Sequence, residues 1–312
     1  MCAPARPLLP SPRSQASPLL VVAVVLLAAA GCSRSSGGSP ANPVLPSGTG
    51  GMAVIGHGTD VFGRYAVEEN KLGKVLDVDA LNAAGWLVHD PSVAEYDYAY
   101  AEGSTVTQYM SQLGGSVGLS GSYAFFSGEA QVAFSQDTYR KEGYSYVSIV
   151  EHFWKESLKL DNSMWNARER LRPFLTPAAK AAIDDTDTTR RWTGAEVIAA
   201  FGTHVIDGVY TGGRLDYHLA IQIKDAQYQT SLHEYAKADF KSTFASASMT
   251  QSLDSTIKTA MDSYSRVRTI NAKGGAAQYA HPEDDAQYQL WKASLDSNPV
   301  YCGIISGALT GL

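Results

Sequence analysis

The chain has 312 residues, of which 45% are hydrophobic, and a formal net charge of −6. This apolar content is enough for a large core, and the acidic balance argues against DNA or RNA as a partner. Its three cysteines are too few for a disulfide framework, so the composition also excludes a small disulfide-stabilised protein.

The N-terminus has the features of a targeting segment. Arg6 and Arg13 precede an apolar run, 19–30, that is shorter than a transmembrane helix normally requires. Small residues then lead to Cys32, in a sequence that resembles the lipid-attachment motif of bacterial lipoproteins. The alternative is an ordinary secretory signal followed by an incidental cysteine. Both interpretations predict export, and the first predicts that the mature protein begins at an acylated Cys32.

This assignment divides the chain into a lipoprotein signal peptide (1–31), a flexible tether (32–51) and one domain (52–312). The tether is rich in Ser, Gly, Pro and Asn, and it has too few apolar residues to repay the entropy of ordering. Ser33, rather than Asp, follows the predicted lipid-bearing cysteine. We therefore expect an outer-membrane anchor in a diderm host, with display at the cell surface or release as further options.

The first strand signals are alternating residues at 96–100 and 144–149. Between them, 114–134 is rich in Gly and Ser, and its apolar residues change parity. A hairpin tip or a β-bulge would explain the change, because a slip of one residue reverses the face of every side chain. Periodicity alone favours a soluble meander with one buried face. The apolar residues are Val117, Leu119, Tyr123 and Phe125 at odd positions, then Phe126, Ala130, Val132 and Phe134 at even positions.

Helix signals follow in the middle of the chain. Thr176 and Pro177 have the order of a capping residue and a proline at the first helical position. Thr193 and Glu196 have the spacing of a capping box ahead of an apolar run. Gly202 is placed to end that second helix, because glycine accepts the left-handed conformation of a helix C-terminus.

Two segments of strand composition, 205–210 and 215–223, lie on either side of Gly212 and Gly213. Paired glycines at such a place allow a sharp bend or a close approach of two backbones. We therefore expect the pair to be structural, and we expect Gly213→Val to lower stability or to block assembly.

Segment 232–267 fits both a helix and a strand, because its apolar residues are mostly four positions apart. Four is close to the helical period of about 3.6 and is also a multiple of the strand period of about 2. Taken alone, the spacing favours an amphipathic surface helix, in which Met261→Lys at an exposed edge would be tolerated. In an extended strand Met261 would lie on an apolar face and Thr256 on the polar face. The apolar residues are Phe240, Phe244, Met249, Leu253, Ile257 and Met261.

An aromatic-Gly-Thr-His group precedes a glycine pair, in residues Phe201, Gly202, Thr203, His204, Gly212 and Gly213. The motif resembles the signature of the MACPF (membrane attack complex/perforin) family, and its spacing agrees in full. Two positions depart from the family pattern, because Phe201 stands where Tyr or Trp is usual and Val205 where Phe or Tyr is usual. Segments 54–65, 274–275 and 291–299 are similar to the family's opening and closing elements, in the family order.

The resemblance implies an α+β fold like that of MACPF and cholesterol-dependent cytolysin proteins, with a bent four-stranded antiparallel sheet flanked by helical clusters. In the family two such clusters, at 104–145 and 232–270 here, become transmembrane β-hairpins after ring assembly. A membrane admits strands only when neighbours close their edges, which requires an oligomeric barrel. The implied inserting residues are Val117, Leu119, Tyr123, Phe125, Val132, Phe134, Phe240, Phe244, Met249, Leu253, Ile257 and Met261.

The implied partners are a lipid membrane, further copies of the chain in a ring, and a protein or glycan receptor. No enzyme, cofactor or metal site is predicted, because the histidines are scattered and no His-Glu-x-x-His or Cys-x-x-Cys motif occurs. In the family Thr203 and His204 would serve packing and hydrogen bonding, and Cys302, in an apolar stretch, is expected to be a buried hydrophobic residue. The leading function is pore formation, as an antagonistic toxin for example. The alternative is a non-lytic surface protein that uses the same fold for adhesion or interaction.

Overall fold

The structure, a computed structural model, describes residues 44–45, 50–61, 63–93, 96–116, 143–161, 163, 168–183, 191–245, 253–305 and 309–311. All of them belong to one compact unit, Pro40–Leu312. The predicted signal peptide, Cys32 and most of the tether lie outside the described residues. So do seven of the candidate inserting residues, namely Val117, Leu119, Tyr123, Phe125, Val132, Phe134 and Met249.

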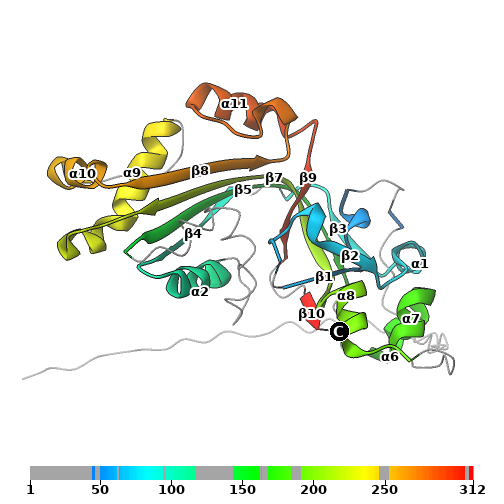
Figure 1. Cartoon of the computed structure of the whole chain (residues 1–312). Coiled ribbons are helices and arrows are strands. Elements are labelled where there is room, and N and C mark those ends of the chain that lie inside the picture. Colours follow the sequence, from blue (N-terminus) through cyan, green and yellow to red (C-terminus); the bar gives the residue numbers. More distant parts are fainter. Residues whose placement is uncertain are drawn as a thin grey trace, which may run out of the picture. The chain divides into compact units, whose positions relative to one another are not determined.

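A large antiparallel sheet organises the described part of the chain (Figure 1). Its strands are β3 (Leu87–Asp90), β4 (Tyr96–Gly103), β5 (Ser145–Leu160), β7 (Gly208–Ile221), β8 (Arg266–Lys273) and β9 (Val300–Ile304). The long strands β5 and β7 pair with each other through the whole sheet. At one end the order is β4-β5-β7-β8, and at the other end β3 and β9 take the outer positions. The sheet is thus four strands wide at both ends.

The sheet bends where the β5–β7 ladder is interrupted. The register shifts between Trp154 and Glu156, and Gly212, which pairs with Trp154, has a φ of +147°. A side chain at Gly212 would overlap the backbone carbonyl of Phe153. A β-bulge bends the strand that carries it, and glycine permits the close approach of the partner strand. The predicted bent sheet is confirmed, although 208–221 forms one continuous strand rather than two.

A second, smaller sheet consists of β1 (His57–Thr59), β2 (Lys71–Lys74), β6 (His204–Ile206) and β10 (Leu309–Gly311). Its strands are antiparallel in the order β10-β6-β1-β2. Gly58 and Gly73 leave room for the end of α8 (Gly194–Phe201), because a side chain at either glycine would overlap the helix. The other α-helices near the small sheet are α1 (Val78–Ala83), α6 (Arg168–Leu171) and α7 (Pro177–Ile183). Short 3₁₀ helices occur along the described chain, namely η1 (Gly50–Ala53), η2 (Glu68–Asn70), η4 (Arg172–Phe174), η5 (Ala226–Ser231) and η6 (Ala277–Tyr279).

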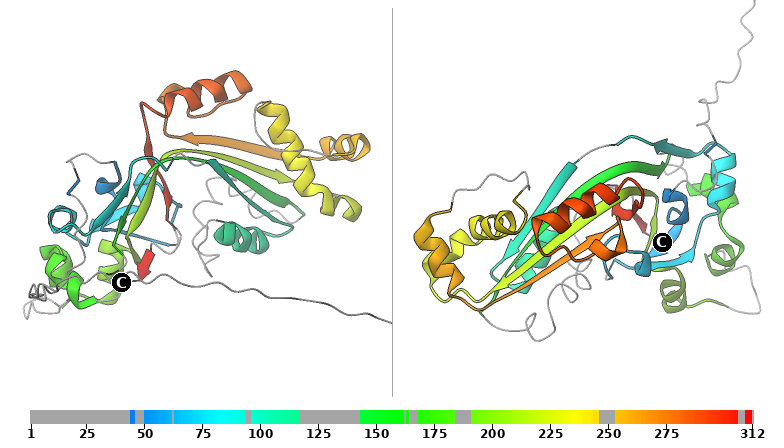
Figure 2. Two further views of the ribbon diagram at one scale, coloured as in Figure 1. Left: turned by 180° about the vertical axis from the view of Figure 1, so that it is seen from behind. Right: turned by 90° about the horizontal axis from the view of Figure 1, so that it is seen from above.

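Helices cover both faces of the large sheet. One face packs against α9 (Leu232–Thr243), α10 (Ser255–Asp262) and α11 (Asp285–Ser294), in a core that includes Leu215, Tyr217 and Leu219 of β7. The opposite face packs against α2 (Val106–Ser116), whose Tyr109 and Met110 are buried in a separate cluster. Figure 2 shows α2 and the α9–α11 group on opposite sides of the long strands. These helices flank the sheet as predicted.

The local helix signals are confirmed. The hydroxyl of Thr176 accepts a hydrogen bond from the backbone N–H of Ala179 at the start of α7, at 3.2 Å. Both hydrogen bonds of the capping box between Thr193 and Glu196 are present, and Gly202 ends α8 with a φ of +77°. The strand prediction at 144–149 is correct but short, because β5 continues to Leu160.

Candidate functional site

Two insertions in the large sheet are attached to neighbouring strands at the same end. One insertion, 104–145, connects β4 to β5, and its flanking pair is Gly103↔Tyr146. The other, 222–265, connects β7 to β8 and is flanked by Ile221↔Arg266. The two inner strands also end together, at Ser145↔Ile221. All four strands therefore stop at one edge of the sheet, and both insertions begin there.

The described part of the second insertion contains the α9–α10 cluster, which here means the helices α9 and α10. Three residues of its apolar side are fully buried, because Phe240, Phe244 and Met261 are 0% exposed. Phe240 meets the rings of Tyr217 and Phe244 edge to face, with centroids 5.3 and 5.2 Å apart. Aromatic pairs of this geometry add to the free energy gained by burial. The predicted tolerance of Met261→Lys is wrong, because this side chain lies in the core rather than at an exposed edge.

Leu253 and Ile257 are partly buried and pack against the same core. The cluster is therefore helical where the structure describes it, with its apolar stripe turned toward the sheet, as the helical interpretation of this segment predicts. Its exposed side carries Thr256 and Thr259 of α10.

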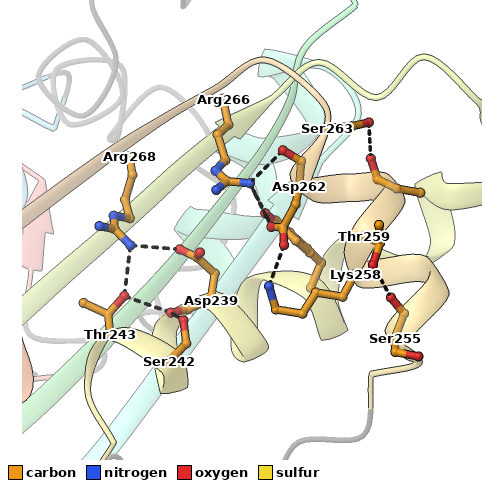
Figure 3. Close-up of polar contacts among 12 residues, drawn as sticks. Asp239, Ser242, Thr243, Ser255, Lys258, Thr259, Asp262, Ser263, Arg266 and Arg268 are labelled. Atoms are coloured by element: carbon orange, nitrogen blue, oxygen red, sulfur yellow. Dashed lines mark hydrogen bonds and ion pairs between the residues drawn. The ribbon is translucent and has the colours of Figure 1, made fainter.

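Polar contacts hold both helices of the cluster to β8 (Figure 3). Asp239 of α9 accepts a hydrogen bond from the hydroxyl of Tyr217, at 2.6 Å, and pairs with Arg268 of β8 at 3.3 Å. Arg268 also donates to the hydroxyl of Thr243, at 2.9 Å. The buried Tyr217 hydroxyl is the least exposed part of this group, and burial raises its pKa well above the usual value.

Asp262, at the end of α10, forms the second group of contacts. It accepts hydrogen bonds from the hydroxyl of Tyr235 at 2.7 Å, from Lys258 at 2.6 Å and from Arg266 of β8 at 2.9 Å. Burial acts to raise the pKa of Asp262, but these donors and charges outweigh it, so the pKa is lowered. The side chains are about a third exposed, so each ion pair by itself is worth at most ~1 kcal/mol. We call these contacts of Asp239 and Asp262 the β8 latch.

The signature motif lies at the junction of α8 and the small sheet. Phe201 is buried, and Thr203 joins two strands because its N–H donates to Thr59 O at 3.0 Å and its hydroxyl accepts from Val61 N at 3.1 Å. His204 Nδ1 lies 3.0 Å from the Thr203 hydroxyl, and partial burial lowers the pKa of this histidine. The geometry is that of a structural junction between helix and sheet.

The two glycine pairs meet at the bend of the large sheet. A side chain at Gly213 would overlap Leu295, which follows α11. Gly274 and Gly275 both have positive φ, +76° and +70°, and Trp291 Nε1 donates to the carbonyl of Gly274 at 2.9 Å. These contacts hold α11 against the bend of the large sheet.

Several buried polar residues were missed by the sequence analysis. Glu151 is 0% exposed and accepts hydrogen bonds from the hydroxyls of Tyr96 and Tyr288, both at 2.6 Å, while burial raises its pKa. The other missed residues are His152, Arg214, Asp216 and His218, which are buried on the opposite face of the sheet. Arg214 and Asp216 pair with each other two residues apart on β7, whereas the partners of Glu151 lie far away in the sequence.

The described residues contain no group of three or more His, Cys, Asp or Glu that could hold a metal ion. Within the same ranges no helix is both long and apolar enough to cross a membrane. Cys302 is buried, and burial raises the pKa of its thiol to about 12, so it is a poor nucleophile.

Comparisons with known proteins point to one family. The family model of the MAC/Perforin domain matches residues 49–309. Among solved structures, GNIP1Aa from Chromobacterium piscinae is similar with a TM-score of 0.68 and 20% identity, over 84% of this chain and 52% of that one. A MAC/Perforin-domain protein of Bacteroides thetaiotaomicron VPI-5482 has a TM-score of 0.64 and 13% identity, over 87% and 58%. The chain thus spans little more than half the length of either protein, and no curated protein matches it.

Proposed function

Because the chain belongs to the MAC/Perforin domain family, we propose that it is a membrane-directed pore-forming protein rather than an enzyme. In this proposal copies of the chain assemble side by side, and the two insertions of the large sheet refold into β-hairpins that cross a lipid bilayer. Export and a lipid anchor at Cys32 are part of the proposal. Cys32→Ser should then release the protein from the membrane fraction and remove the lipid mass from its N-terminus.

One observation carries the proposal: both insertions start and end on directly paired residues at the same edge of the sheet. If 104–145 and 222–265 became extended, they would continue the existing ladders from Gly103↔Tyr146 and Ile221↔Arg266. Each would add one hairpin of about 20 residues per arm, whereas a membrane-spanning strand needs only ~9–11. The sheet would thus grow from its edge without a change in strand order.

The sequence of the second insertion is compatible with both a helical and an extended state. In the helical state Met261 is buried, and Leu253 and Ile257 pack against the core. In an extended state these three residues would share a face with Thr259, and Thr256 and Lys258 would lie on the other. A barrel wall needs one face toward lipid and one toward water, and a bilayer tolerates the strands only when the barrel closes.

The experiment compares Thr259→Lys with Thr256→Lys. Both threonines are exposed on α10, so both variants should fold as well as the original chain. In the extended state the lysine of the first variant would face lipid, and the lysine of the second would face water. A lysine facing lipid near mid-bilayer costs ~2–4 kcal/mol in every subunit. We therefore expect Thr259→Lys to abolish dye release from liposomes, and Thr256→Lys to keep it and to shift single-channel selectivity toward anions.

Both variants must first melt and bind liposomes like the original chain. Equal dye release from the two variants would contradict an alternating hairpin at α10. No release from any of the three proteins, with membrane binding intact, would instead favour a non-lytic surface protein.

A further inference from the structure

A cavity of about 640 Å³ lies beside β8, an outer strand of the large sheet. Three of its walls are formed by segment 64–69, by the end of β8 and by the start of β9. Segments far apart in the sequence thus meet around one space, whose size is typical of small-molecule sites. Its polar and aromatic lining includes Arg64, Glu69, Asn271, Lys273, His281 and Tyr301.

Two cations lie on opposite walls of this cavity. Lys273 is on β8, with its ammonium 3.7 Å from Asp216, and its side chain is only 15% exposed. Asp216 is in turn held by the buried Arg214, at 2.8 Å, whose charge keeps the pKa of this carboxyl low. Arg64 lies on the wall formed by 64–69. The charges behind the β8 wall are therefore fixed in place, and each of two walls of the cavity carries a cation.

The wall that carries Arg64 is rigidly placed. The hydroxyl of Tyr65 donates to the carbonyl of Ile304 and accepts from its N–H, at 3.3 and 2.9 Å, and Arg214 donates to the carbonyl of Tyr65 at 3.0 Å. Ala66 has a φ of +45°, and among the described residues it is the one non-glycine residue with a positive φ. A strained conformation persists where its surroundings determine it, and such residues concentrate at ligand sites. The cavity is thus formed before any ligand arrives.

We propose that this cavity binds the phosphate group of a small polar molecule, with Arg64 and Lys273 as its two cationic partners. A guanidinium donates two parallel hydrogen bonds to a phosphate, and an ammonium adds a point charge. Asn271, on the β8 wall, and Tyr301, on the β9 wall, add hydrogen-bond donors. Burial raises the pKa of Tyr301 far above its usual value, so the hydroxyl keeps its proton.

The acidic side chains at the cavity restrict the rest of the ligand. Glu68 and Glu69 lie on the same wall as Arg64, and Glu68 also pairs with Lys71. Two carboxylates would repel a second anionic group, whereas they would attract an ammonium or accept hydrogen bonds from hydroxyls. We therefore expect a single phosphate attached to a neutral or cationic remainder, as in phosphocholine. The source of that chemistry is either a free phosphomonoester or the headgroup of a lipid.

The test is calorimetric titration of the purified full chain with inorganic phosphate and with phosphocholine, at constant ionic strength in sodium chloride. We expect binding of both, tighter for phosphocholine, and a higher Tm in their presence. Arg64→Ala should weaken binding about 10- to 100-fold, because it removes charge-assisted hydrogen bonds. Lys224→Ala removes an exposed cation elsewhere and should leave the affinity unchanged.

A second variant, Ala280→Leu, adds bulk to the cavity wall without changing its charge and should also weaken binding, which keeps the test decisive if Arg64→Ala folds poorly. Flotation with phosphatidylcholine vesicles then separates the two sources, since Arg64-dependent flotation identifies the lipid headgroup and soluble binding alone identifies a free phosphomonoester. Absence of binding to both soluble probes, or equal binding by the chain and both variants, would overturn the proposal. None of these measurements depends on pore formation.

Discussion

At the scale of single residues, the bend of the large sheet depends on what a side chain would meet. A Cβ at Gly212 would overlap the Phe153 carbonyl, and one at Gly213 would overlap the Leu295 side chain, whereas Gly194 has nothing within 4 Å. We expect Gly213→Ala to lower the free energy of unfolding by about 1–3 kcal/mol through overpacking. Gly212→Ala should cost more, because backbone moves less easily than a side chain and its φ is +147°.

Gly194→Ala is the matched control, since alanine in an open helical position should be neutral or stabilising by up to ~1 kcal/mol. Urea unfolding of the three variants measures their free energies of unfolding and so ranks their stabilities. If Gly213→Ala melted like Gly194→Ala, the second glycine would be incidental to the bend.

His152 predicts a pH dependence of stability. It is 4% exposed and stacks on Trp154 with centroids 4.3 Å apart, and in the described structure neither ring nitrogen has a hydrogen-bond partner. Burial, and then the charge of Arg214, lowers its pKa to about 3, while Asp216 opposes this. The unfolded chain binds this proton at about pH 6.5, so the free energy of unfolding falls as the pH drops from about 6.5 toward 3.

Between pH 7.5 and 5 this one residue should remove about 2 kcal/mol. His152→Phe keeps the stack on Trp154 and should abolish that part of the pH dependence. The comparison with the original chain matters, because burial raises the pKa of Asp207 to about 7 and that carboxyl acts in the opposite direction. Parallel stability curves for His152→Phe and the original chain would show that the ring is solvated. His281→Phe, at an exposed histidine, is the control.

At the scale of elements, the features that could be predicted from the sequence are those that depend on residues close together in the chain. The capping box of α8 and the start of α7 involve residues three apart, and both are found as expected. The length of β5 could not be predicted, because Glu151 is accommodated by hydroxyls 55 and 137 residues away. The same limit applies to Met261, since its spacing identifies the apolar stripe but only packing shows how deeply the stripe is buried.

The β8 latch should set how easily the α9–α10 cluster leaves the sheet. Asp262→Asn keeps the shape of the side chain but removes the charge that pairs with Lys258 and Arg266. We expect a loss on the order of 1 kcal/mol, confined to α10, because these pairs are partly exposed. Amide exchange in α10 should then be faster by about five-fold, with β5 and β7 unchanged.

Asp296→Asn removes a surface ion pair of the same kind, with Lys155, and serves as the control. Under the pore-forming proposal Asp262→Asn should also release dye from liposomes faster. Unchanged exchange in α10 would mean that apolar packing alone holds the cluster.

At the scale of the whole molecule, β4 and β8, the outer strands of the β4-β5-β7-β8 part of the sheet, have complementary side chains. β4 presents Tyr96 and Tyr98, which are 40% and 43% exposed, and β8 presents Arg266 and Arg268. Register places all four on the same face. In the described structure β4 pairs only with β5, and β8 only with β7. Exposed strand edges are sites for pairing with another chain, and arginine stacks favourably on tyrosine.

Under the pore-forming proposal we therefore expect β4 of one copy to dock along β8 of the next, a head-to-tail contact that gives a ring when the rotation between copies closes. Tyr98→Lys should disrupt only the β4 edge, because it places a cation on the strand that is expected to meet the arginine-bearing β8 edge of the neighbour. Such a copy still joins an assembly through β8 and then stops further growth. Mixed at one part in five with the original chain, it should reduce dye release far more than in proportion to its share. Ile198→Lys, at a residue 51% exposed on α8, should only dilute the activity. Proportional loss with both variants would place the contact between copies elsewhere than on β4.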